Sequence, residues 1–126
     1  MAYPTAEAEK WAGEMGQLVG DCRLLLGRDL TAYVAGATHP GELDGWASLP
    51  TAPAQAARDR LEAVTRIATA LRAWLRPEQI VAHLREPDPG LGDLSPARAL
   101  HQSATRQERA MIERRVRRAP AGTPVR

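Results

Sequence analysis

The segment from Pro53 to Leu75 constrains the fold most, because its apolar residues recur at the spacing of an α-helix. Steps of three and four residues place them on one face of a helix with 3.6 residues per turn. That face carries Ala57, Leu61, Val64, Ala68, Leu71 and Leu75. We therefore predict a long central helix that ends at Arg76, since Pro77 cannot continue a helix.

A second amphipathic helix is predicted near the N-terminus. Thr5 is a suitable N-cap for it, and Gly27 is a suitable stop. Its apolar stripe faces either the central helix or a second copy of the chain, so both a monomer and a homodimer fit the sequence. The stripe consists of Trp11, Met15, Leu18, Cys22 and Leu25.

Prolines and capping residues divide the C-terminal half into three further helices. Pro77 begins the first, and Ser95 followed by Pro96 begins the second. Thr105 and Glu108 have the spacing of a capping box, which opens a last helix. No segment alternates as a strand does, so we predict an all-α fold with six or seven helices.

We divide the chain into three parts. Residues 1–52 form an N-terminal helix-turn-helix-like region, residues 53–118 form a C-terminal helical region packed with it, and residues 119–126 form a disordered tail. Within the first part, Asp29 and Pro40 are predicted to start two short helices joined by a turn.

The second of these short helices is acidic. A DNA-reading helix presents Arg, Lys, Asn or Gln to base edges, whereas this one carries Glu42 and Asp44 and none of the four. Two hypotheses stay open: a structural or dimerising unit, or a DNA reader that contacts phosphates through nearby cations. Those cations are Arg28, His39, Arg58 and Arg60.

Charge is divided unevenly between the halves. Residues 1–63 carry five basic and nine acidic side chains, a net charge of −4, and residues 64–126 carry twelve and six, a net charge of +6. Electrostatic attraction to a partner is therefore expected from the C-terminal half.

We expect no enzymatic activity, no cofactor and no metal. His39, His83 and His101 lie in no metal-ligand pattern, and Cys22, the single cysteine, lies on the apolar stripe as a core thiol would. No apolar run reaches the roughly 18–20 residues of a membrane span, and the acidic N-terminus is unlike a signal peptide. The expected class is a cytoplasmic binding protein without membrane contact.

The segment after residue 85 carries the most specific pattern. Its order is Pro87-Asp88, Leu91, Ser95-Pro96 and Leu100, and LTAYVAG, ELDGWAS and IATALRAWL precede it. Over about residues 28–118 the chain resembles the Xre/MbcA/ParS-type antitoxins, whose toxin-binding region has elements in this order. It departs from the family at Leu49 and Ser103, where glycine is usual.

The resemblance implies a two-part antitoxin without chemistry of its own. The C-terminal unit would cover the active-site cleft of a RES-domain toxin that consumes NAD⁺, and the N-terminal unit would dimerise or bind operator DNA and regulate its own operon. The toxin-binding positions that the pattern implies are Pro87, Asp88, Leu91, Ser95, Pro96 and Leu100.

The last helix is rich in arginine. Arginine binds carboxylates through its planar fork, so a salt-sensitive contact with an acidic toxin surface is predicted. We assign it to Arg109, Arg114, Arg115 and Arg118.

Three alternatives remain for this half of the chain. The arginines could form a solvated helix face. Met111, Ile112 and Val116 could form core or interface. The whole chain could be a stand-alone helix-turn-helix-like transcription regulator or DNA-binding protein without a toxin partner.

Overall fold

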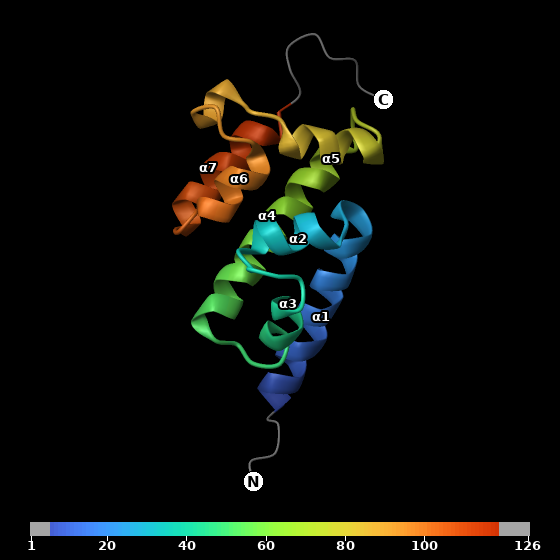
Figure 1. Cartoon of the computed structure of the whole chain (residues 1–126), viewed down its shortest axis with the longest axis vertical. Helices are drawn as coiled ribbons and strands as arrows, with labels where there is room; N and C mark the ends of the chain where they lie inside the picture. The colour runs from blue at the N-terminus through green and yellow to red at the C-terminus, as the bar shows by residue number, and fades with distance from the viewer. Residues whose placement is uncertain (1–5, 119–126) are drawn as a thin grey trace. The chain divides into compact units, whose positions relative to one another are not determined.

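The computed structural model describes residues 6–118, and within them the fold is all-α, as predicted (Figure 1). The chain forms seven α-helices and one 3-10 turn in this range. Thr5 and the tail 119–126 lie outside the described residues. In chain order the elements are α1 Ala6–Leu26, α2 Arg28–Ala35, α3 Glu42–Trp46, α4 Ala52–Leu71, α5 Pro77–Arg85, η1 Pro89–Leu91, α6 Pro96–Gln102 and α7 Arg106–Val116.

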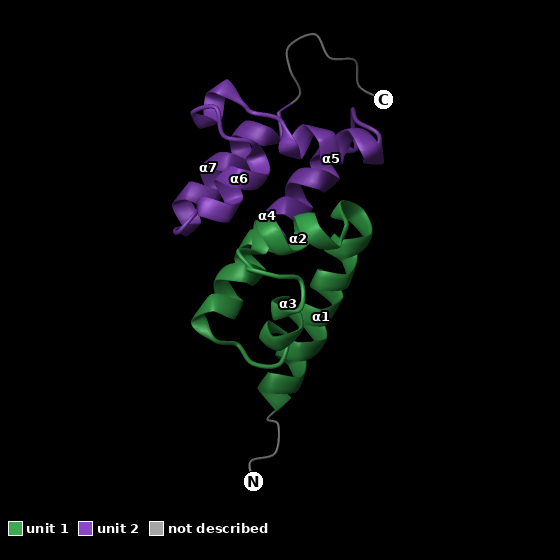
Figure 2. Ribbon diagram, in the orientation of Figure 1, with its two compact units in different colours: residues 1–61 green, residues 62–126 purple. Residues whose placement is uncertain are grey.

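The chain separates into two compact units, which we call unit 1 (Met1–Leu61) and unit 2 (Glu62–Arg126) (Figure 2). The division lies inside α4, whereas the boundary predicted from the sequence lies before Pro53, close to the start of that helix. The first half of α4 belongs to unit 1 because its side chains contact α1 and α2. A periodic pattern marks where a helix starts but not which neighbours each of its turns contacts.

In unit 1, α1 packs against α2 and α3. Its buried residues are Met15, Val19, Cys22 and Leu26, so the buried stripe is rotated from the predicted one. The predicted Leu18 and Leu25 are only half-buried. Leu24 on the same helix is 90% exposed.

The boundaries of the short helices correct two predictions. Gly27, with a φ of 87°, ends α1 as expected, but it also precedes α2 directly. Asp29 therefore lies in the first turn of α2, where a carboxylate suits the positive helix end, and does not cap it. Pro40 does not open α3 either, because a turn through Gly41 separates it from the first helical residue, Glu42.

The predicted face of the central helix is confirmed. Ala57, Leu61, Val64, Ala68 and Leu71 are all fully buried. The helix ends at Leu71, before the predicted end at Arg76, and Leu75 lies beyond it and is half-buried. Pro77 begins α5 as predicted, and the backbone N–H of Arg76 donates to the Gln79 side chain at 2.9 Å.

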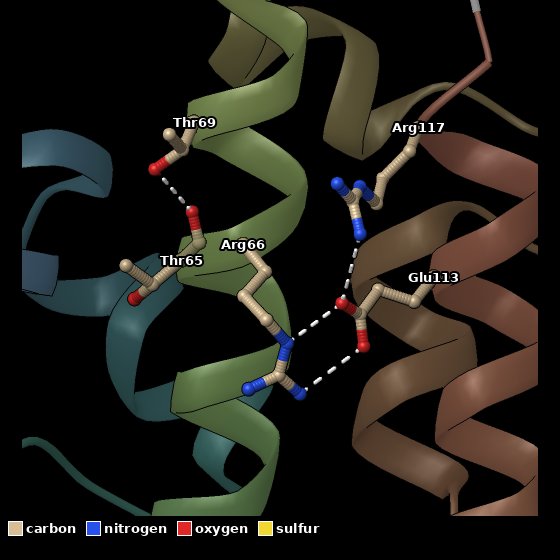
Figure 3. A network of polar contacts seen from close by, with 5 residues as sticks. All are labelled: Thr65, Arg66, Thr69, Glu113 and Arg117. Carbon is tan, nitrogen blue, oxygen red and sulfur yellow. Dashed lines mark hydrogen bonds and ion pairs between the residues drawn. The ribbon is translucent and has the colours of Figure 1, made fainter.

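In unit 2, α6 packs against both α5 and α7. Both predicted caps form: Ser95 Oγ accepts from the Arg98 N–H at 3.1 Å, and Thr105 Oγ1 accepts from the Glu108 N–H at 3.1 Å. A two-point ion pair connects the second half of α4 to α7, from Arg66 Nε and Nη2 to Glu113 at 2.7 and 3.1 Å (Figure 3). These contacts fix which face of α7 is buried.

Ile112 and Val116 lie on the buried face of α7, which places these two in the core, whereas Met111 is 57% exposed. Within residues 6–118, no helix has both the length and the apolar character needed to cross a bilayer.

Candidate protein-binding groove

The loop between α5 and α6 is organised around Asp88. Its backbone N–H donates to the Leu94 carbonyl at 3.0 Å, and its carbonyl accepts from Leu91 and Asp93 at 2.9 and 3.1 Å. Its side-chain Oδ1 accepts from the Gly90 N–H at 2.9 Å. These bonds link the backbone of Gly90, Leu91, Asp93 and Leu94 to one residue, which restricts the conformations open to the loop.

An arginine fastens this loop to α7. Arg115 donates from Nη2 and Nε to Asp88 Oδ1 at 2.8 and 3.3 Å. The guanidinium passes directly over Gly90, where an added Cβ would lie 2.6 Å from Arg115 Cζ. A residue without a side chain at position 90 therefore lets Arg115 reach Asp88.

The same contacts lower the pKa of Asp88. The hydrogen bond from Arg115 is the largest cause, burial opposes it, and the Gly90 N–H and the charge of Arg115 reinforce it. Asp88 consequently remains ionised to lower pH than an ordinary aspartate, and the fastening persists at neutral pH.

The fastened loop forms one wall of a groove of about 420 Å³, which α6 and α7 complete. Ile112 is buried, Leu91 and Leu94 are half-buried, and Met111 is mostly exposed. An exposed concave surface of aliphatic side chains can accept an apolar side chain of a partner. The full lining is Gly90, Leu91, Gly92, Leu94, Ala99, Gln102, Glu108, Met111 and Ile112.

The predicted toxin-binding residues fall into three groups around this groove. One group lies in or beside the groove and its fastening, and comprises Asp88, Leu91 and Arg115. A second group is exposed, and comprises Pro87, Arg114 and Arg118. The third group belongs to the internal structure of unit 2. Ser95 caps α6, and the other three residues are buried: Pro96, Leu100 and Arg109.

Of the residues that line the groove, only Leu91 was a predicted toxin-binding position, and Met111 and Ile112 had been left open as core or interface. The lining residues that the sequence did not indicate are Gly90, Gly92, Leu94, Ala99, Gln102 and Glu108. A signal for Met111 was present. With positions 109, 112 and 116 on the buried face of α7, positions 108, 111 and 115 share a different face at steps of three and four. The α6 residues had no such signal, because their exposure depends on where the loop lies.

The four cations predicted to contact DNA lie in unit 1 and differ in their contacts. Arg58 Nη2 lies 2.9 Å from Glu14 Oε2, and its guanidinium stands 5.1 Å from the Trp11 ring centroid. Arg60 Nη1 donates to the Ala35 carbonyl at the end of α2, at 3.0 Å. Arg28 and His39 are exposed. Two of the four cations thus make contacts within unit 1.

The two short helices α2 and α3 are present, but α3 spans only five residues. Its carboxylates also have partners within unit 1: Asp44 lies 3.4 Å from Arg23, and Glu42 accepts from the Thr38 hydroxyl at 3.0 Å. A helix-turn-helix that reads DNA stays a prediction.

Cys22 and His83, which the sequence also singled out, pack against other parts of the chain. Cys22 is buried, with its Sγ 3.9 Å from the Leu61 carbonyl, as expected of a core thiol. His83 is half-buried on α5, and its ring meets the Trp74 ring edge-on at a centroid distance of 5.5 Å.

Comparison with protein-family models, with curated proteins and with solved structures found no match. The family therefore remains a resemblance.

Proposed function

We propose that this chain is the antitoxin of a type II toxin–antitoxin pair. It binds a RES-domain toxin through unit 2 and neutralises it by covering the entrance to the toxin's NAD⁺-consuming cleft. One observation carries the proposal: the segment that resembles the family's toxin-binding region forms a fastened loop, and this loop walls an exposed apolar groove.

The groove has the properties of a binding surface for a polypeptide. Interfaces concentrate their energy in a few apolar anchors surrounded by polar groups. Met111, Leu91 and Leu94 supply apolar area, and Gln102, Glu108 and Arg115 stand around it. Because the loop already holds its shape, little conformational entropy is lost when a partner binds.

A protein that acts in this way performs no chemistry. The toxin loses activity because its entrance is occupied, so inhibition follows from the stoichiometry and affinity of the complex. A complex of equal affinity that left the entrance open would not protect the cell.

Co-expression tests the proposal. The RES-domain gene beside this one is expressed alone and with the intact chain, and growth and cellular NAD⁺ are measured. We expect arrest and NAD⁺ loss from the toxin alone, and recovery of both with the chain. Absence of a neighbouring RES-domain gene, or arrest that the chain does not relieve, contradicts the proposal.

A stand-alone DNA-binding regulator is the second candidate, and one observation favours it: Arg106, Arg114 and Arg118 are all exposed. Arginines on a surface bind phosphates with an affinity that falls steeply as salt rises. A gel-shift series with the chain's own promoter and with an unrelated duplex separates the two. Tight binding to the promoter alone favours a regulator, and equal, salt-sensitive binding to both indicates only the arginines.

A further inference from the structure

We propose that the groove of unit 2 takes one large apolar side chain from a protein segment that has carboxylates on one side of that residue only. This inference rests on the proposed function and deepens it, because it specifies the kind of toxin segment that unit 2 binds.

The first step is the size and chemistry of the groove. A volume of about 420 Å³ lies in the lower range of pockets that enclose small ligands, roughly 300–1,000 Å³. Its aliphatic wall comes from three elements: Leu91 and Leu94 from the loop, Ala99 from α6, and Met111 and Ile112 from α7. The groove has room for a bulky apolar side chain, and its aliphatic lining favours such a side chain over a charged one.

The second step is the charge along α7. Glu108 lines the groove in the first turn of the helix. Arg115 stands at the other end of the same face, and the exposed Arg114 lies beside it. Seven residues separate positions 108 and 115, which is about 10 Å along a helix. The Arg115 end of the groove therefore carries more positive charge than the Glu108 end, where the exposed Arg106 stands two positions before the carboxylate.

The third step is the kind of protein segment that this charge distribution along α7 selects. Arg115 already binds Asp88, so Arg114 and the exposed Arg118 provide the positive charge open to a partner. A carboxylate placed over them is attracted, whereas the same carboxylate over Glu108 is repelled. A segment with acids on both sides of its apolar residue, or on the wrong side, is disfavoured.

Panning a library of random twelve-residue peptides against the intact chain tests this directly. We expect enriched peptides to share one large apolar residue with Asp or Glu on one flank. Met111→Glu places a carboxylate in the groove and should weaken the best peptide at least about tenfold. Arg114→Glu should weaken it about threefold to tenfold at low salt and less at high salt.

The matched control is Leu24→Glu, which makes the same charge change at a more exposed position in unit 1. It should leave peptide binding unchanged. Met111→Ala accompanies Met111→Glu, and circular dichroism verifies that both remain folded. Amide chemical shifts of the complex should change in the loop 86–95 and in α7.

Three results overturn the inference: no enrichment, peptides that bind Met111→Glu as tightly as the parent chain, or acids enriched on both flanks. Association of the chain with itself that Met111→Glu abolishes would assign the groove to a second copy and also overturn it. The library contains no toxin, so a failed co-expression leaves this result intact. Growth rescue by Met111→Glu overturns the inference but not the antitoxin proposal.

Discussion

Both units fasten a turn with an arginine that passes over a glycine. In unit 1, Arg60 passes over Gly36 and donates to the carbonyl of Ala35 at the end of α2. In unit 2, Arg115 passes over Gly90 and binds the carboxylate of Asp88. The first arginine thus binds a group that never titrates, and the second binds one that does.

The two glycines also differ. Gly36 has a φ of 88°, in the left-handed region, and an added Cβ there would lie 2.7 Å from Arg60 Nη1. Gly90 is not among the glycines with a positive φ, so it is required only for the space that the Arg115 side chain occupies. The fastening in unit 1 therefore depends on backbone conformation, and the fastening in unit 2 on a charge pair that can release.

Gly36→Ala should have the largest effect. It forces a residue with a Cβ into the left-handed region and displaces Arg60, so the chain should lose about 1–3 kcal/mol of unfolding free energy. Urea denaturation measures it. A loss below about 0.5 kcal/mol would show that the end of α2 relaxes without cost.

Arg60→Ala should cause the second-largest loss of unfolding free energy. It leaves the Ala35 carbonyl without this donor and removes the packing of the arginine stem, at a cost of about 1–2 kcal/mol. Arg114→Ala is the matched control, because Arg114 is exposed, and a surface change of this kind stays within about 0.5 kcal/mol. Equal losses in the two variants would show that Arg60 stabilises the fold no more than an exposed arginine does.

Asp88→Asn should change how stability depends on pH. A carboxylate whose pKa is lowered on folding stabilises the fold fully above its unfolded pKa, which is about 3.9. That contribution is lost as the pH falls through the lower folded pKa. The parent chain should therefore lose stability in acid more steeply than the variant. Parallel curves of melting temperature against pH would contradict the assigned role of Asp88.

Gly90→Ala should have the smallest effect on stability. The new methyl group displaces Arg115 from Asp88 without altering any charge, so the global melt should change less than in Gly36→Ala. Hydrogen exchange should accelerate at the amides of Leu91 and Asp93 and remain unchanged in unit 1. Unchanged exchange in the loop would show that Arg115 does not hold it.

Much of the fold could be predicted from local patterns. The buried face of α4, the start of α5 at Pro77 and the caps Ser95 and Thr105 all depend on residues close in sequence. The stripe on α1 was rotated because that helix packs against several neighbours. Asp29 was misassigned because Gly27 both ends one helix and precedes the next.

The site was only partly predictable, because it depends on contacts between distant residues. The pair Asp88 and Arg115 is separated by 27 positions, and only the folded unit brings them together. Buried Arg109 and exposed Met111 reverse what their side-chain types suggest. The order of residues in the loop pointed to the segment that forms one wall of the groove, but the groove itself depends on the packing of three elements.

Calorimetry of a RES-domain protein, the proposed partner, with the parent chain, Met111→Glu and Leu24→Glu tests the central claim most directly. We predict that Met111→Glu weakens the affinity at least about tenfold, which corresponds to about 1.4 kcal/mol, and that Leu24→Glu leaves it unchanged. Equal affinity of Met111→Glu and the parent chain, or a loss confined to Leu24→Glu, would contradict a binding surface in unit 2.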